Sequence, residues 1–242
     1  MCHAIATRNL RIGRAVVTVC GIVLASWPVC RAAEPPTEPP AKPRFGIRDS
    51  EISRGSATTQ LFGVRATGSR FVFVLDRSRS MSVLNGNPMR AAKAELIASL
   101  QDLSSVNQFQ IIAYNEQPNV VNPFPARPPR ILFGTDDNKR AAESFIRAIR
   151  PDGGTNHGEA LRLALRMQPD VIFLLTDADE PWLTSSDLDQ ISKLNRGGIL
   201  IHVVEFGTGS MTARDDFLVR LARQNSGQHV FVDISQLESS GP

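Results

Sequence analysis

The sequence predicts an α/β fold with a largely parallel sheet. Residues 71–75 and 171–175 are uninterrupted apolar runs, as expected for strands buried on both faces of a parallel sheet. Between the predicted strands lie segments of about 12 residues with the period of amphipathic helices, an alternation typical of βαβ units. Hydroxyl and carboxylate side chains follow both runs directly, which places them at the carboxyl edge of the sheet, where open α/β sheets bind ligands.

The amino-terminal elements begin with a strand expected at residues 60–66. Residues 67–70 form a turn into the strand at 71–75, so this hairpin is expected to add an antiparallel edge. Asn87-Pro88 begins the first helix, because proline is favoured in the first helical turn. The apolar face of this helix consists of residues at helical spacing: Met89, Ala92, Leu96, Leu100 and Leu103.

A second buried strand is expected at residues 109–113. Residues 119–122 lie in a proline-rich stretch, so we expect them to form only a short antiparallel edge strand. The next helix begins at residues 135–137, where two aspartates complement the positive end of the helix dipole. The inward face of this helix is apolar: Ala141, Ala142, Phe145, Ile146 and Ile149.

A turn at residues 151–154 precedes the third helix, which ends before Pro169. Its buried face is again apolar: Ala160, Leu161, Ala164 and Leu165. Thr184 with Asp187 forms a capping-box pattern for a fourth helix, which is expected to end at Gly197-Gly198.

The carboxyl-terminal elements are a strand at residues 199–204, a helix opened by Thr212 with Asp215, and a last strand at residues 229–232. The inward face of this last helix is apolar: Phe217, Leu218, Leu221 and Ala222.

Length and charge restrict the class of protein. The chain has 242 residues, of which 42% are hydrophobic, enough for a leader and one domain with a packed core. The net charge of +3 comes from the first 32 residues, which contain four arginines and no acid; the remainder carries 23 basic and 24 acidic side chains. A nearly neutral body argues against a general nucleic-acid or membrane-surface binder.

The amino terminus has the pattern of an export signal. Arg8, Arg11 and Arg14 precede an uncharged apolar run of 13 residues at 15–27, and small residues before Ala32 suit cleavage after it. The alternative is an uncleaved membrane anchor, for which the run is short.

We expect four regions along the chain. Residues 1–32 are the signal peptide or anchor, 33–59 a proline-rich linker or tail, 60–236 the folded domain and 237–242 a short tail. All three cysteines lie in the first region, so a mature domain has no disulfide, thiolate metal site or cysteine nucleophile. They are Cys2, Cys20 and Cys30.

Five oxygen-bearing side chains lie at predicted strand ends or helix starts in three distant segments. Asp76, Ser78 and Ser80 form a D-x-S-x-S loop after the first apolar run, Thr155 follows two glycines, and Asp177 follows the second apolar run. Neutral hydroxyls and carboxylates are ligands that suit a hard divalent cation such as Mg²⁺, Mn²⁺ or Ca²⁺.

These residues resemble the metal-ion-dependent adhesion site of the von Willebrand factor type A family. Residues 71–81 and 153–161 also look like the family's flanking sequence, and the resemblance extends over about residues 61–233. It implies a doubly wound, Rossmann-like sheet of six mostly parallel strands with helices on both faces and one antiparallel edge strand.

The resemblance also implies how the site works. We expect the hydroxyls of Ser78, Ser80 and Thr155 to form the inner shell of a cation, with Asp76 and Asp177 acting through bound water. Mg²⁺ is the expected ion, with Mn²⁺ or Ca²⁺ as alternatives. An Asp or Glu carboxylate from a protein partner would complete the coordination.

Each segment also has an ordinary structural interpretation. The D-x-S-x-S loop is compatible with an N-cap and turn, Thr155 with the N-cap of the third helix, and Asp177 with the start of a loop. The occurrence of all three in this order favours the metal site.

Four neighbouring residues are candidates for contact with a partner: Arg79, His157, Asp179 and Trp182. Arg79 would meet an acidic partner, although a solvated side chain is the alternative. Trp182 is either an interface anchor or part of the loop packing. His157 is the nearest base, but it lacks a nucleophile with recognised geometry, so a catalytic role is not favoured.

We expect a binding module rather than an enzyme, exported to the periplasm, cell envelope or extracellular space. Membrane contact would come only through an uncleaved amino-terminal segment. The alternatives are a metal-dependent phosphohydrolase with Asp76 as nucleophile and a metal-free envelope scaffold. A nucleophilic aspartate of that kind is expected to have a second acid two residues later, where this chain has Ser78, and the complete set of five oxygens argues against the scaffold.

Overall fold

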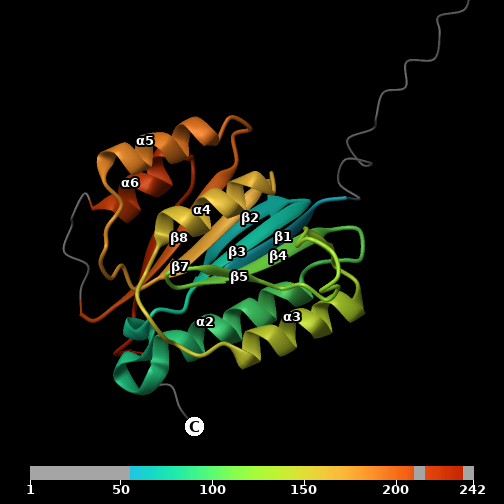
Figure 1. The fold of residues 1–242 in the computed structure, drawn as a ribbon, viewed down its shortest axis with the longest axis horizontal. Helices are drawn as coiled ribbons and strands as arrows, with labels where there is room; N and C mark the ends of the chain where they lie inside the picture. Colours follow the sequence, from blue (N-terminus) through green and yellow to red (C-terminus); the bar gives the residue numbers. More distant parts are fainter. Residues whose placement is uncertain (1–54, 210–215, 237–242) are drawn as a thin grey trace, which may run out of the picture. The chain divides into compact units, whose positions relative to one another are not determined.

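The central sheet of the computed structural model, which describes residues 55–209 and 216–236, is mostly parallel and covered by helices on both faces (Figure 1). Its principal strand order is β5-β4-β3-β7-β8-β9. Every neighbouring pair in this order is parallel except β4 and β5. The strands are β3 (Arg70–Asp76), β4 (Gln108–Tyr114), β5 (Pro118–Val120), β7 (Val171–Thr176), β8 (Leu200–Gly207) and β9 (His229–Asp233). This order of six strands, with an antiparallel edge, confirms the predicted fold class.

Two groups of helices cover the sheet (Figure 1). Helices α2 (Val83–Gln101) and α3 (Asp136–Ala148) contribute to one apolar cluster, together with residues of a hairpin at 57–68. Helices α4 (His157–Arg166), α5 (Ser185–Leu194) and α6 (Phe217–Gln224) contribute to the other. The central strands are buried on both faces, as their uninterrupted apolar sequence predicts.

The first two strands form a hairpin of their own, so the single strand expected at residues 60–66 is wrong. Strands β1 (Ala57–Leu61) and β2 (Val64–Gly68) pair only with each other, in a separate two-stranded antiparallel sheet. Phe62 and Gly63 both have positive φ (47° and 81°), as a tight two-residue hairpin turn requires. The turn therefore interrupts what the apolar pattern suggested was one strand.

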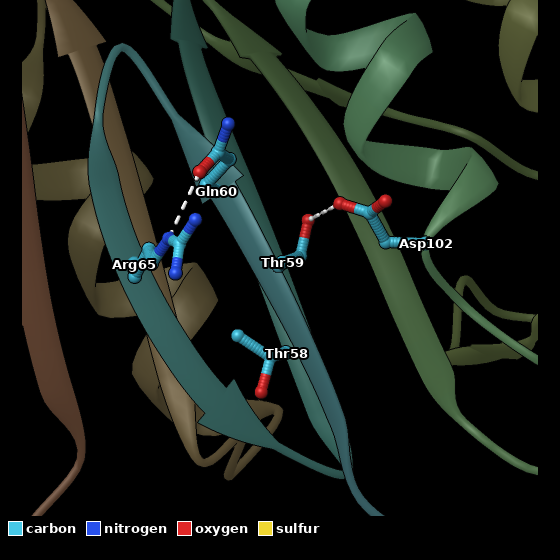
Figure 2. Close-up of a pocket in the computed structure, with 5 residues that line it drawn as sticks. All are labelled: Thr58, Thr59, Gln60, Arg65 and Asp102. Carbon is cyan, nitrogen blue, oxygen red and sulfur yellow. Dashed lines mark hydrogen bonds between the residues drawn. The ribbon is translucent and has the colours of Figure 1, made fainter.

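A buried threonine attaches this hairpin to the end of α2 (Figure 2). Thr59 Oγ1 lies 3.0 Å from Asp102 Oδ2 and 3.2 Å from the carbonyl oxygen of Ser99. On the exposed side of the hairpin, Arg65 Nε donates to Gln60 Oε1 at 3.1 Å. The hairpin thus extends the apolar layer on the α2 face without joining the main sheet.

The edge of the main sheet is interrupted. Strand β6 (Leu132–Phe133) pairs antiparallel with β4 beyond the point where β5 ends, which adds a short seventh strand that the sequence did not predict. Between β5 and β6 the chain leaves the sheet. The buried Gln110 spans the gap, where its Nε2 donates to the carbonyl oxygens of Val121 (3.0 Å) and Arg130 (2.7 Å).

Helix starts follow local sequence closely. Thr135 caps α3, and Thr184 and Asp187 form the predicted capping box of α5. Helix α2 contains three residues with positive φ at 84–86, so its regular part begins after Gly86, as the Asn87-Pro88 pattern predicts. Asn156 caps α4, which excludes the alternative in which Thr155 is the cap.

One helix boundary differs from the prediction, and the residues predicted to open another helix lie outside the described residues. Helix α5 ends at Leu194, before the expected stop at Gly197-Gly198, because Asn195 already leaves the helical conformation. Asp216 caps α6, whereas the expected opening residues, Thr212 and Asp215, lie outside the described residues.

The expected leader at 1–32 and most of the linker at 33–59 also lie outside the described residues. Within 55–209 and 216–236, no helix is both long and apolar enough to cross a membrane.

Candidate metal centre

The candidate site lies where two adjacent parallel strands end. Leu75 of β3 is in register with Leu175 of β7, so the residues that follow these two strands emerge side by side. Asp76 follows Leu75, and Thr176 and Asp177 follow Leu175. The adjacency of β3 and β7, more than 90 residues apart in sequence, brings two of the three predicted segments together.

The third segment is held against the first by backbone hydrogen bonds. Arg79 N donates to the carbonyl oxygen of Gly153 at 3.1 Å, and Asp152 N donates to that of Arg77 at 2.8 Å. Arg77 N in turn donates to the carbonyl oxygen of Tyr114, at the end of β4. These bonds fix the loop that carries Thr155 beside the D-x-S-x-S loop.

Two hydrogen bonds connect three of the predicted ligands through Ser80. Ser78 Oγ and Ser80 Oγ are 3.0 Å apart, and Ser80 Oγ donates to Asp177 Oδ1 at 3.0 Å. Oxygens from two distant segments therefore converge as the sequence predicts.

The hydroxyl of Thr155, a fourth predicted ligand, is buried. Thr155 Oγ1 has no hydrogen-bond partner among the described residues. A buried hydroxyl without a partner is costly, so a ligand for this oxygen is the natural explanation.

Asp76 is held firmly in place by the protein. Its side chain is 0% exposed, and Oδ1 accepts a hydrogen bond from Ser78 N at 2.8 Å. Oδ2 accepts from Thr176 Oγ1 at 2.7 Å. With hydrogen bonds to both of its oxygens, this buried carboxylate is poorly placed to attack a substrate, whereas its negative charge remains available to a nearby cation.

The surroundings of Asp177 disfavour its ionised form. Burial raises the pKa of Asp177 to about 6, and the negative charges of Asp76 and Asp179 add to this, while the Ser80 hydroxyl opposes it. The protein alone therefore does not fully stabilise the negative charge of an ionised Asp177. A bound cation would do so.

The donor set is compatible with a hard divalent cation, because it consists of neutral hydroxyls and two carboxylates. Within residues 55–209 and 216–236, no group of three or more His, Cys, Asp or Glu side chains is arranged to hold a metal ion. Any cation here would therefore depend on the serine and threonine hydroxyls. This favours Mg²⁺-like chemistry over that of softer ions.

His157 lies behind the site rather than on its surface. It is 1% exposed, so its predicted contact with a partner is wrong. Its Nδ1 lies 2.7 Å from the hydroxyl of Tyr114, and its Nε2 lies 3.3 Å from the carbonyl oxygen of Asp179. It packs at the start of α4, where the sequence gives no sign of its burial.

The hydrogen-bond partners of His157 determine which of its ring nitrogens carries the proton. Burial lowers the pKa of His157, so the imidazole is neutral near pH 7. A carbonyl oxygen only accepts, so Nε2 carries the hydrogen, and Nδ1 accepts from the Tyr114 hydroxyl. Burial also raises the pKa of Tyr114, which keeps that hydroxyl protonated.

The other candidates for partner contact do lie at the surface. Arg79, Asp179 and Trp182 are exposed, Trp182 by 61% of its area. Trp182 Nε1 donates to the carbonyl oxygen of Ala178 at 3.1 Å, so the indole is fixed to the loop that follows Asp177. Its position is therefore defined even though most of its surface is free.

Sequence reasoning missed three residues that shape the site. Thr176 and Tyr114 contact Asp76, with Tyr114 OH 3.3 Å from Oδ2, and Glu116 Oε1 accepts from Gly154 N at 2.6 Å. Tyr114 and Glu116 follow the apolar run at 109–113, so the rule that singled out Asp76 and Asp177 also applies to them.

Comparisons with known proteins agree with this fold. Residues 71–180 match the family model described as von Willebrand factor type A domain. Inter-alpha-trypsin inhibitor heavy chain H4 of Bos taurus is 26% identical over 172 residues, which cover 64% of this chain but only 18% of that protein. The chain thus spans less than a fifth of the length of this relative.

Solved structures show the same architecture. A von Willebrand factor type A protein from Catenulispora acidiphila has a TM-score of 0.59 at 21% identity, over 76% of this chain and 47% of that one. Proximal thread matrix protein 1 from the mussel byssus, in a form with zinc in its MIDAS motif, has a TM-score of 0.50 at 19% identity, over 70% and 43%. Residues 71–180 thus match the von Willebrand factor type A domain model, and the solved structures share its fold.

Proposed function

We propose that this domain binds a protein partner through a divalent cation, Mg²⁺ in the first instance. Ser78, Ser80 and Thr155 would supply hydroxyl oxygens to the cation, and Asp76 and Asp177 would supply negative charge. An Asp or Glu side chain of the partner would complete the coordination. The zinc-containing MIDAS motif of the mussel protein is consistent with a metal in this position.

The observation that carries this proposal is the Thr155 hydroxyl, which has no partner among the described residues and lies on a loop hydrogen-bonded to the D-x-S-x-S loop. The hydrogen bond from Arg79 N to the carbonyl oxygen of Gly153 holds the Thr155 loop against the D-x-S-x-S loop. The buried Oγ1 of Thr155 has no donor or acceptor among the described residues. A cation would satisfy this oxygen and would also stabilise the buried charge of Asp177.

Charge explains why the partner would contribute an acid. Two aspartates balance a divalent ion formally, but Asp76 already accepts hydrogen bonds from the protein through both oxygens. The cation therefore remains attractive to one further carboxylate, an interaction that strengthens when the interface excludes water. Exposed Arg79 and Trp182 would flank that contact as a charge and an apolar anchor.

Export is part of the same proposal. The arginines and apolar run before residue 32 have the pattern of a signal peptide, and the remaining chain has no cysteine. The domain would then act in the periplasm, cell envelope or extracellular space. An uncleaved amino-terminal segment would instead hold it at the membrane.

A phosphohydrolase with Asp76 as nucleophile is less compatible with the geometry. The Asp76 carboxylate is fully buried and hydrogen-bonded through both oxygens, and a serine occupies the position two residues later. A phosphatase screen on purified protein tests this alternative. Turnover by the unmodified protein that disappears in Asp76→Asn would favour the phosphohydrolase and overturn the binding proposal.

Calorimetric titration with Mg²⁺ and Mn²⁺ tests the site itself. Thr155→Val keeps the shape of the side chain and removes its oxygen, so we expect it to weaken metal binding by about tenfold or more. Thr67→Val, on the exposed side of the hairpin, is the matched control and should bind as the unmodified protein does. Equal affinity in all three proteins would remove Thr155 from the site.

Pull-down from a cell-envelope extract tests partner binding. The bait is the intact protein, first with Mg²⁺ and then with a chelator, and Asp177→Asn serves as a second bait that retains the fold. Partners lost both on chelation and in the variant support the proposal. A partner retained in both conditions would mean that binding does not pass through the metal.

A further inference from the structure

A groove lies beside the loops that carry the candidate metal-site residues, because Arg77 and Asp152 of these loops line it. It has a volume of about 360 Å³ and lies between the end of α3 and strands β4 and β5. Arg77 and Asp152, which line it, are joined by a backbone hydrogen bond of 2.8 Å. The volume is within the range of small-molecule sites.

Two guanidinium groups line this groove. Arg77 is half-buried, and its side chain has no hydrogen bond or ion pair within the described parts of the chain. Arg150 is exposed, and its Nη1 donates to the carbonyl oxygens of Arg147 and Ile149, which leaves its other nitrogens available. Two lining guanidinium groups exceed the one lining carboxylate, that of Asp152, and this excess of positive charge favours an anionic ligand.

The carbonyl oxygens at the end of α3 already have a second cationic donor besides Arg150. Lys93 Nζ donates to the same two carbonyl oxygens as Arg150, at 3.2 and 2.5 Å. Burial, and then the charge of Arg150, lower the pKa of Lys93. Asp152 is the one acid that lines the groove, and its Oδ1 accepts from Gly153 N. It forms no ion pair with either arginine in the part of the chain that the structure describes.

The remaining lining residues are apolar except for Asn119 of β5. Phe145, Ala148 and Ile149 of the α3 end form one wall, and Ala113 of β4 contributes to the other. A ligand that fits both parts has an anionic head and an apolar body. An inorganic anion would leave this apolar wall exposed to water, so it fits less well.

We propose that this groove binds an amphipathic carboxylate, with the carboxylate between Arg77 and Arg150 and an aromatic or branched body against Phe145. Binding does not require the cation, because the lining residues are not the residues assigned to the metal. The site therefore extends beyond the proposed function and stands or falls independently of it.

Titration of the intact protein with 3-phenylpropionate, followed by NMR, tests the proposal. We expect a Kd of about millimolar for a ligand of this size. The neutral analogue 3-phenylpropanol keeps the ring and should bind at least tenfold more weakly, on the order expected for a lost charged hydrogen bond. Equal binding of the two, or no binding of the acid, overturns the proposal.

Variants locate the ligand. Arg77→Gln and Arg150→Gln should each weaken binding by about tenfold, and Ala148→Trp should abolish it by filling the groove. Arg140→Gln, on the same helix but outside the groove, is the control and should have no effect. Unchanged binding in the first three variants would place the ligand elsewhere.

Two further measurements complete the design. Repetition in chelator should give the same Kd, whereas loss of binding would overturn independence from the metal. The tripeptide Gly-Gly-Phe, with a free or an amidated terminus, distinguishes two sources of the carboxylate. Tighter binding of the free peptide than of 3-phenylpropionate assigns the groove to a protein carboxyl terminus, and weaker binding assigns it to a small free acid.

Discussion

Tyr114 is the residue at which the D-x-S-x-S loop meets the protein interior. Its hydroxyl lies 3.3 Å from Asp76 Oδ2 and 2.7 Å from His157 Nδ1, and the side chain is fully buried. His157 continues the chain of contacts to the backbone of Asp179. The D-x-S-x-S loop and the loop before Trp182 are thus connected through buried side chains.

Tyr114→Phe should destabilise the protein by about 1–2 kcal/mol, because His157 Nδ1 loses its hydrogen-bond donor in a buried site. Urea unfolding at pH 7 measures this change. The aromatic packing between Tyr114 and His157 (5.8 Å between ring centres) is retained, so a loss well above this range would mean that the ring itself had moved.

His202 gives the fold a dependence on pH. It is 4% exposed, stacks on Phe173, and accepts a hydrogen bond from Gln228 N through Nδ1. Burial lowers its pKa from the usual 6.5, so the unfolded chain binds a proton more readily than the folded protein does. Its contribution to stability is present above pH 6.5 and is lost as pH falls below that value.

We therefore expect the free energy of unfolding to decrease as the pH falls from 7 through 6.5 and below, and the decrease to be smaller in His202→Gln. Urea titrations of both proteins across this range measure the difference. The comparison isolates His202, because all other titrating groups are shared. Identical pH slopes would show that His202 does not contribute.

At the scale of elements, the interrupted edge strand is the feature that local sequence conceals. Strands β5 and β6 both pair with β4, and Gln110 spans the ladder between them. Gln110 Oε1 also accepts from Ile111 N at 2.7 Å, so the buried amide is well satisfied. The segment between the two strands is anchored at both ends by this one side chain.

Gln110→Met keeps the length of the side chain and removes both donors. The carbonyl oxygens of Val121 and Arg130 then lose a partner, so stability should fall by about 2 kcal/mol. The segment between β5 and β6 should also open locally, which limited trypsin digestion detects as faster cleavage after Arg130. Thr67→Val, on the distant hairpin, should be cleaved at the unmodified rate.

Local sequence predicted some elements and not others for identifiable reasons. The helix caps Thr135 and Thr184 depend on contacts within three residues, so the sequence pattern was sufficient. The hairpin turn at Phe62-Gly63 requires two positive φ angles, and a phenylalanine in the first position gave no warning of it. Gln110 appears in sequence as a polar interruption, because its partners are 11 and 20 residues away.

At the scale of the whole molecule, the proposed cation should stabilise the fold. A ligand that binds only the folded state at 100 times its Kd adds about 2.7 kcal/mol. For a domain of this size we expect melting to rise by about 5–10 °C on addition of Mg²⁺. Differential scanning calorimetry with Mg²⁺ and with chelator measures this shift.

The control for this experiment is Asp177→Asn, which removes the buried charge and retains the hydrogen-bond acceptor for Ser80. Its melting temperature should be higher than that of the unmodified protein in chelator, because the variant lacks a carboxylate that is ionised at pH 7 although burial disfavours its charge. Its response to Mg²⁺ should be small. A full response in this variant would contradict a role for Asp177.

The sequence by itself determined the fold class, most helix starts and which oxygen-bearing side chains follow the strands. Each of these depends on local periodicity or capping, which act over a few residues. Tertiary structure alone decided that Thr155 Oγ1 has no partner within residues 55–209 and 216–236, that His157 is buried, and that the edge strand is interrupted. These outcomes depend on which distant segments become neighbours, because burial and hydrogen-bond satisfaction are properties of the packed chain.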